Sequence, residues 1–300
     1  MCKVYAIASQ KGGVTKTTTV LNLATALGLM GKKVLCIDLD PQGSLSICAG
    51  VDNPDNLSIT TYTLLNAALN EDKLPEPSDY IISSEKIDVI PCNIGLSAFE
   101  LNRGHEIGAE RALQTVIEPL RELYDVILLD TSPSLGILTV NAITASDSVL
   151  ITVTPQLLSA IGLKLLIRTI QKVQKHINPD VAIEGVLMTM CDTRTNLYKD
   201  MSEIMASTYG QGSNSNSSQS QYNSQDHNQN SGIHRSLAHN SNQNNRQGSS
   251  QIIKIFNTII PHSTKVGEAN LRRQSVLLYD ENSKPSKAYK DFAKELVANV

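Results

Sequence analysis

One stretch near the N-terminus combines glycines, lysines and threonines in a pattern suited to binding phosphate: Lys11, Gly12, Gly13, Val14, Thr15, Lys16, Thr17 and Thr18. Small residues between a strand and a helix let backbone N–H groups converge on phosphate oxygens, and the helix N-terminus adds a positive partial charge. In such a loop Lys16 can reach the β- and γ-phosphates of a nucleotide, and the Thr17 hydroxyl can ligate Mg²⁺. The sequence therefore predicts a nucleotide and magnesium site.

This loop departs from the usual pattern G-x-x-x-x-G-K-[ST], because Gln10 and Thr15 stand where its glycines belong. It has the variant form K-G-G-x-x-K-T, with an extra lysine at its head. A β-branched residue such as Thr15 fits if its backbone φ is negative, and the loop is strained if φ is positive. The alternative interpretation is a glycine turn beside a chance lysine.

Three acidic residues argue against that alternative. Asp130 ends the apolar run 126–129, which has the Walker B form, and Asp38 and Asp40 lie at the end of the apolar run 34–39. Such residues emerge at the carboxyl edge of strands, where open α/β sheets bind ligands. Each carboxylate alone would more often be a solvated strand end, but beside the loop we interpret all three as nucleotide-site residues.

The elements that must position these residues alternate along the chain. Strands are predicted at 4–8, 34–39, 87–90, 126–129, 149–153, 185–188 and 252–260. Helices are predicted from Thr17 to Gly31, at 109–123, 157–176 and 197–208, and from about Pro285 to the C-terminus. This alternation predicts an α/β fold: an open, mostly parallel, twisted sheet with helices on both faces.

The composition fits one domain with an insert. The chain has 300 residues, and its 41% hydrophobic content with few aromatic residues favours a core of aliphatic side chains. Residues 210–251 consist almost wholly of Ser, Asn, Gln, Gly and His, so we expect a disordered insert at about 211–250 within a single domain spanning 1–300. A plain spacer, a nucleic-acid tether and a self-associating tract all remain open for this insert.

Cysteine usage and charge restrict the class of protein. The five cysteines are scattered without a C-x-x-C pair, which disfavours a disulfide framework, a zinc site or a paired-cysteine iron–sulfur cluster. A strand begins almost at the N-terminus and no apolar run approaches the ~20 residues that span a bilayer, so we expect a cytoplasmic protein. The net charge is −3, so contact with nucleic acid requires a local basic patch or one assembled by dimerisation.

Four motifs together carry a family resemblance: the loop KGGVTKTTT, the turn DLDPQG, the strand YDVILLDTSPSLG and the later segment LMTMCDTRTNL. In this order they resemble the ParA/Soj family of DNA-partition ATPases, relatives of MinD within the deviant Walker A class of P-loop proteins. The similarity runs from about residue 3 to 210 and from about 252 to the C-terminus, so only the polar insert falls outside it.

The resemblance implies catalytic roles for three residues. Lys11 would reach across an ATP-bound sandwich dimer to the partner's phosphates, and Lys16 would keep its ordinary phosphate contact. Asp40 would position the attacking water on a switch segment. Asp130 would hold Mg²⁺ through a water, with Thr17 as the other metal-binding residue.

The resemblance also implies cofactors and partners. The cofactors are ATP and Mg²⁺, and the nucleotide contacts extend from the loop residues 11–18 to Asp38, Asp130 and Pro261. The ATP-bound homodimer would bind double-stranded DNA without sequence preference, which associates it with the nucleoid. A ParB-like centromere-binding protein would stimulate hydrolysis and release the DNA.

The DNA-binding residues are the least constrained part of this interpretation. Candidates by position are Arg194, Lys265, Arg272 and Arg273, with Lys199 as a helper, and each could equally be part of a solvated charged face. The basic stretch after the last strand is altered, because His262 replaces one expected basic residue. Such contacts would position the protein on phosphates without reading sequence.

Two other functions stay open. A nucleotide-dependent scaffold with little turnover is favoured by Thr15, which departs from the Gly or Ala common in the family. A MinD-like membrane-positioning ATPase would need the apolar stripe of the last helix to face lipid; the stripe comprises Ala288, Tyr289, Phe292, Ala293, Leu296 and Val297. We expect this stripe to pack in the core instead, and expect no membrane partner.

Overall fold

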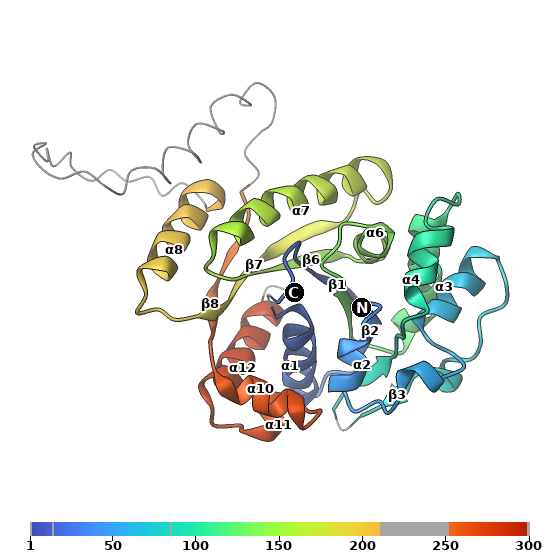
Figure 1. Ribbon diagram of the computed structural model, residues 1–300, viewed down its shortest axis with the longest axis horizontal. Helices are drawn as coiled ribbons and strands as arrows, with labels where there is room; N and C mark the ends of the chain where they lie inside the picture. The colour runs from blue at the N-terminus through green and yellow to red at the C-terminus, as the bar shows by residue number, and fades with distance from the viewer. Residues whose placement is uncertain (1, 14, 85, 211–251, 299–300) are drawn as a thin grey trace, which may run out of the picture.

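The computed structural model describes residues 2–13, 15–84, 86–210 and 252–298. Within this part of the chain, strands form one sheet in the order β3-β4-β2-β5-β1-β6-β7-β8 (Figure 1). Their bounds are β1 Lys3–Ala8, β2 Val34–Leu39, β3 Ile82–Ser83, β4 Asp88–Ile90, β5 Val126–Thr131, β6 Ser148–Val153, β7 Ala182–Cys191 and β8 Ile255–Pro261. All neighbours are parallel except β3, which pairs antiparallel with β4. The predicted mostly parallel sheet is confirmed.

Helices cover both faces of the sheet, as Figure 1 shows. Those packed on one face are α1 Lys16–Leu29, α2 Ser44–Cys48, α10 Thr264–Leu271, α11 Val276–Tyr279 and α12 Lys284–Val297. Those packed on the other are α3 Thr61–Leu69, α4 Leu96–Ala98, α5 Ala112–Ile117, α6 Ile137–Ala145, α7 Leu157–His176 and α8 Asn196–Tyr209. Short helical turns occur at Pro54–Asn56, Pro77–Asp79, Phe99–Arg103, Ala109–Arg111 and Glu118–Glu122.

Alternating residues of the central strands feed two separate apolar cores. In β1, Ile7 packs with α1 and α12, whereas Ala6 packs with the helices of the opposite face. Side chains two positions apart in a strand share a face, so burial on both sides requires a continuous apolar run. Cys36 of β2 and Leu128 of β5 lie in the α1 core. The acidic residues two positions later in each strand therefore also face α1.

The predicted elements mostly match the observed ones. The helix predicted at 157–176 coincides with α7, and the strand predicted at 34–39 coincides with β2. The prediction of one continuous helix at 109–123 was wrong. In this range only α5 is α-helical, and tighter helical turns flank it. Pro119 is the second residue of the turn Glu118–Glu122, and a proline cannot donate the hydrogen bond that an α-helix interior requires.

The last helix packs into the core, as predicted. Tyr289, Phe292, Ala293 and Leu296 are fully buried. The Phe292 ring meets Phe256 of β8 edge to face, with 4.9 Å between ring centroids. The apolar stripe of α12 is thus occupied by the protein itself. No helix in the described part of the chain is long and apolar enough to cross a membrane.

The two chain segments that flank the polar insert lie together. The backbone N–H of Ile253 donates to the carbonyl of Tyr209 at 2.9 Å, which joins the end of α8 to the residues before β8. The predicted disorder of 211–250 falls outside the described residues. The insert therefore leaves and re-enters the fold at nearly the same point.

Candidate nucleotide site

Two of the residues that the structure describes in the loop between β1 and α1 have left-handed backbone. Gly13 has φ 72° and Thr15 has φ 62°; Val14, between them, lies outside the described residues. Glycine adopts this region freely, but a β-branched residue there costs on the order of 1–2 kcal/mol. Of the two outcomes that the sequence left open for Thr15, the structure shows the strained one.

Lys16 lies at the first turn of α1, with its side chain almost fully buried. Its ammonium group donates to the Lys11 carbonyl at 3.4 Å, which ties the helix to the loop. Burial lowers the pKa of Lys16, and the negative charges of Asp130 and Asp40 oppose that effect. The ammonium therefore stands close to anionic groups inside the protein, as a phosphate contact requires.

Asp38 and Asp130 lie side by side on neighbouring strands, since the two residues are paired in the register of β2 and β5. Both are fully buried. Asp38 accepts hydrogen bonds from the Ser46 N–H at 2.9 Å, the Ser46 hydroxyl at 2.7 Å and the Asp40 N–H at 3.1 Å. Burial raises the pKa of Asp38 to about 6, against the lowering effect of these donors. Asp38 is thus a structural carboxylate that anchors the turn after β2.

Asp130 has a different environment. Neither of its carboxylate oxygens has a well-formed hydrogen bond among the described residues. Burial and then the charge of Asp38 raise its pKa well above the usual range, while the nearby Thr17 hydroxyl and Lys16 ammonium lower it. A buried carboxylate without a partner is costly, and a cation is what would satisfy it. The donor set of Asp130 and Thr17, both oxygen ligands, fits Mg²⁺.

Asp40 lies on the turn that leads from β2 into α2. Its side chain accepts from the Gln42 N–H at 3.0 Å and remains partly exposed at the edge of the sheet. Gly43, with φ 60°, begins α2, and a Cβ there would lie 3.1 Å from the Cys92 carbonyl oxygen. The turn is therefore held at both ends, with Asp40 between them.

Two residues that contact the predicted site were missed by sequence reasoning. Ser46 bridges the site, because its hydroxyl donates to Asp38 and accepts from the Cys92 N–H at 3.0 Å. Gln156, just before α7, holds the Lys11 side chain through its amide oxygen. Neither has a sequence signal of its own, since serine and glutamine are ordinary residues at helix starts.

Pro261 lies at the carboxyl end of β8, on the same edge of the sheet as the loop. Strands β6 and β7 separate β8 from β1, which corresponds to about 14 Å across the sheet. The structure thus places Pro261 apart from Lys16 and Asp130. Only the far end of an extended nucleotide could reach it.

The predicted DNA-binding residues fall into two groups. Arg194 and Lys265 follow the neighbouring strands β7 and β8, whose ends are joined by a hydrogen bond from the His262 N–H to the Cys191 carbonyl at 3.1 Å. Arg272 and Arg273 lie at the other end of α10. The structure therefore places Arg194 and Lys265 after neighbouring strand ends and the two arginines at the opposite end of α10.

Acidic neighbours accompany most of these basic residues. Arg194 is 87% exposed and contacts Asp192 at 2.8 Å, which lowers the pKa of Asp192 to about 2. Lys265 contacts Glu268 at 2.8 Å. Arg273 pairs with Asp52. Such exposed pairs are weak, so the cations can exchange their carboxylates for phosphates.

Comparison with known proteins identifies the family. An AAA domain model matches residues 2–183, more than half of the chain. The sporulation initiation inhibitor protein Soj of Bacillus subtilis is 34% identical, with 100% of both chains covered. The chromosome partitioning protein ParA of Caulobacter vibrioides is 31% identical over 99% of this chain and 94% of its own. This chain belongs to the Soj/ParA family.

The predicted resemblance to Soj/ParA proteins is thus confirmed, and its motifs can be placed in the fold. The loop, the turn after β2 and the end of β5 meet at one edge of the sheet, and the segment after β7 lies farther along that edge. Among solved structures, cobyrinic acid a,c-diamide synthase from Mycobacterium smegmatis, with bound ADP and magnesium, has a TM-score of 0.73 at 29% identity. The match covers 100% of this Soj/ParA chain and 95% of that protein.

Proposed function

We propose that this Soj/ParA protein is a Mg²⁺-dependent ATPase that partitions DNA, a plasmid or a chromosome, through a cycle of dimerisation on ATP and release after hydrolysis. The observation that carries the proposal is the buried cluster of Lys16, Asp38 and Asp130 beside the loop, in which neither carboxylate oxygen of Asp130 has a well-formed hydrogen bond to a described residue. This arrangement has a cation facing phosphate, a carboxylate facing a metal and a second carboxylate holding the switch turn. Among the reactions that the described residues could support, nucleotide hydrolysis fits this arrangement best.

Separate residues of the chain contact the phosphates, the metal and the base. Lys16 binds the β- and γ-phosphates; burial lowers its pKa, and the negative charges of Asp130 and Asp40 oppose that lowering. Thr17 and Asp130 would hold Mg²⁺, which, when bound, neutralises charge on the phosphate oxygens. The N–H groups of the loop, including those of Gly12 and Gly13, orient the phosphates. Pro261 borders the base end of the nucleotide.

Asp40 is the residue proposed to orient the attacking water. Its carboxylate is partly exposed, and its backbone is fixed by the hydrogen bond from its N–H to Asp38. Water must enter between the turn and the loop, so a partly exposed carboxylate is better suited to hold it than the buried Asp130. Because Asp38 anchors the same turn through Ser46, movement of α2 would move Asp40.

The dimer is proposed to form at the carboxyl edge of the sheet. Leu158 and Ile161 are exposed in the first turns of α7, just after the carboxyl end of β6, and a second copy of the chain would cover them. Lys11 stands at the same edge, held by Gln156. In the dimer Lys11 would leave Gln156 and contact the phosphates bound by the partner subunit.

DNA binding is proposed to follow from dimerisation. The chain has a net charge of −3, so the pair Arg194 and Lys265 is too small a patch in one subunit. Two subunits would present two such patches and neutralise more phosphates. Arg272, Arg273 and Lys199 would add contacts. A ParB-like protein would stimulate hydrolysis, and we expect the protein in the cytoplasm, on the nucleoid when bound to ATP.

The test combines gel filtration with an ATPase assay. Wild-type protein should elute as a monomer without nucleotide and as a dimer with ATP and Mg²⁺, and it should release phosphate. Lys16→Ala should abolish both effects because the charge that faces the phosphates is lost, whereas Lys32→Ala, at an exposed position after α1, should change neither. A dimer that forms on ATP without measurable turnover would instead identify a nucleotide-dependent scaffold.

A further inference from the structure

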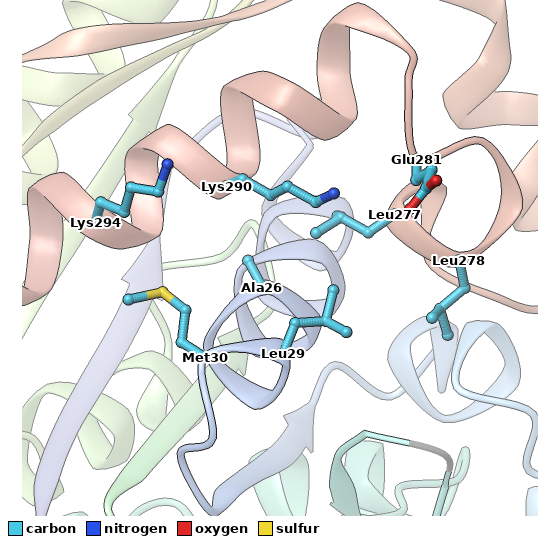
Figure 2. A pocket seen from close by; sticks show the side chains of 8 residues that line it. All are labelled: Ala26, Leu29, Met30, Leu277, Leu278, Glu281, Lys290 and Lys294. Atoms are coloured by element: carbon cyan, nitrogen blue, oxygen red, sulfur yellow. The ribbon is translucent and has the colours of Figure 1, made fainter.

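A hollow lies between the last turn of α1, the short helix α11 and α12. Its volume is about 490 Å³, and the side chains that line it are shown in Figure 2. It lies at the C-terminal end of α1, whereas the phosphate-binding loop lies at the N-terminal end. The 14 residues of α1 separate the two by about 20 Å. A molecule in the hollow would therefore leave the nucleotide site accessible.

The floor of the hollow is apolar. Leu29 is 46% exposed, Met30 43% and Leu278 38%, and Ala26 and Leu277 complete the surface. Figure 2 shows Leu29 and Leu278 converging from α1 and α11. Large apolar side chains that gather around a hollow on a surface mark a binding region. The space is large enough for two or three aliphatic side chains of a partner.

The α12 rim of the hollow is basic. Lys290 and Lys294 are one helical turn apart and both line it. Among the described residues Lys290 makes no ion pair, and Lys294 has only an exposed contact with Asp291 at 3.4 Å. The facing acid is Glu281, on the opposite side of the hollow (Figure 2). Two ammonium groups spaced by one turn match two carboxylates spaced by one turn on another helix.

The positive charge continues beyond Leu278. This residue also borders a second hollow of about 260 Å³, which is lined by Lys86, Arg272 and Arg273. The two hollows share Leu278, and we call them together the groove: its floor is apolar in the first hollow, and basic residues line both. Arg273 is in an exposed pair with Asp52, which a ligand carboxylate can replace, so Lys86, Arg272 and Arg273 are all available to a ligand.

We propose that this groove is a docking site for an acidic amphipathic helix of a partner protein, with aliphatic residues seated on Leu29, Met30 and Leu278 and carboxylates facing Lys290 and Lys294. Charge and shape select this occupant. A basic segment would be repelled by the lysines, and DNA phosphates would leave the apolar floor without a partner. The site goes beyond the proposed ATPase cycle and requires neither nucleotide nor dimer.

The experiment uses a synthetic amphipathic peptide of about 15 residues, with leucines on one face and glutamates flanking that face. The control peptide carries lysine in place of every glutamate. Fluorescence anisotropy with the full-length, nucleotide-free protein should show at least about tenfold tighter binding of the acidic peptide, weakened by salt. Equal binding of the two peptides, or no binding of either, would overturn the proposal.

Charge-reversal variants test whether the peptide binds at this groove. Changing Lys290→Glu and Lys294→Glu together should invert the preference, so that the lysine peptide binds more tightly than the acidic one. Leu29→Glu should weaken the binding of the acidic peptide by about tenfold or more. Lys287→Glu is the matched control, because it lies on α12 outside the groove, and it should have little effect. An unchanged preference after the double reversal would overturn the site.

Two further measurements separate other occupants. Flotation with vesicles of phosphatidylcholine and phosphatidylglycerol, lost in the double reversal, would identify a lipid surface and overturn the helix proposal. Self-association without nucleotide, lost in Leu29→Glu, would identify a second copy instead. ATP turnover of the double-reversal variant should equal that of the wild type, so failure of the docking proposal is distinguishable from failure of the proposed ATPase.

Discussion

Replacing the buried carboxylate of Asp130 by an amide should make the nucleotide-free protein more stable while it destroys the metal site. Asp130 is fully buried and its oxygens have no well-formed hydrogen bond among the described residues, so its charge opposes folding. Asparagine has nearly the same shape. Asp130→Asn therefore removes the charge without opening a cavity.

The neighbouring carboxylate sets the scale of the effect. The pKa of Asp38 is raised to about 6 from an ordinary value of 3.8, and a difference of roughly 2 units corresponds to about 3 kcal/mol. Asp130 lacks the three donors that Asp38 has, so the cost of its charge should be no smaller. The new amide would itself lack partners, which costs about 1–2 kcal/mol. A net gain of about 1–2 kcal/mol is expected at neutral pH.

The gain should depend on pH with a defined sign. The folded pKa of Asp130 lies above its unfolded value, so the folded state binds more protons and wild-type stability falls as pH rises from about 4 toward the folded pKa. Asp130→Asn lacks this contribution. The cost of the unpartnered amide does not depend on pH, so Asp130→Asn should be about 1–2 kcal/mol less stable than the wild type near pH 4 and become the more stable protein toward neutral pH.

Urea unfolding at several pH values, followed by circular dichroism, measures this difference. ATP with Mg²⁺ should stabilise the wild type and should stabilise Asp130→Asn much less, because a neutral amide is a poor magnesium ligand. Loss of stability in Asp130→Asn at neutral pH without nucleotide would refute the argument, since it would show that the carboxylate is satisfied in the folded protein.

Three further changes test other parts of the site. Asp40→Ala should still bind ATP and dimerise but release phosphate slowly and remain on DNA, as measured by turnover and DNA retention; unchanged turnover would place the hydrolytic role elsewhere. Thr15→Gly should raise stability by about 1 kcal/mol by relieving the left-handed strain, whereas Thr18→Gly in the adjoining helix should lower it by a similar amount. Deleting 211–250 should leave the melting temperature and ATP turnover nearly unchanged, because the flanking segments are hydrogen-bonded to each other; a large drop in melting temperature would show that the insert packs.

The positions of the site residues at strand ends were predictable, because the apolar run before each residue marks the strand that it ends. Parallel strands place their carboxyl ends at one edge, so the loop before Lys16, the turn with Asp40 and the end of β5 with Asp130 had to meet there. The helices α7 and α12 were predictable from apolar residues at helical spacing. In contrast, α6 is buried almost all round and shows no such spacing, so it was missed.

The hydrogen-bond partners of the acidic residues could not be predicted from the sequence. Asp38 and Asp130 both end apolar runs, yet only the structure shows that Ser46 donates hydrogen bonds to Asp38, whereas Asp130 has no well-formed hydrogen bond to a described residue. The backbone of Thr15 was equally open, since φ depends on how the loop closes onto α1. Contacts across the sheet, such as that of Lys11 with Gln156, join residues far apart in the chain and leave no local pattern.

The central claim is that ATP converts an acidic monomer into a dimer that binds DNA without sequence preference. The most direct measurement is anisotropy of labelled duplexes of unrelated sequence, titrated with protein in ATP and Mg²⁺ or without nucleotide, at several salt concentrations. Tight binding should require ATP and be equal for all sequences, with log K falling by about 0.9 per phosphate contact for each tenfold rise in salt. Removing the charges of Arg194 and Lys265 should flatten that slope. Tight binding by the nucleotide-free protein, or strong preference for one sequence, would contradict the account.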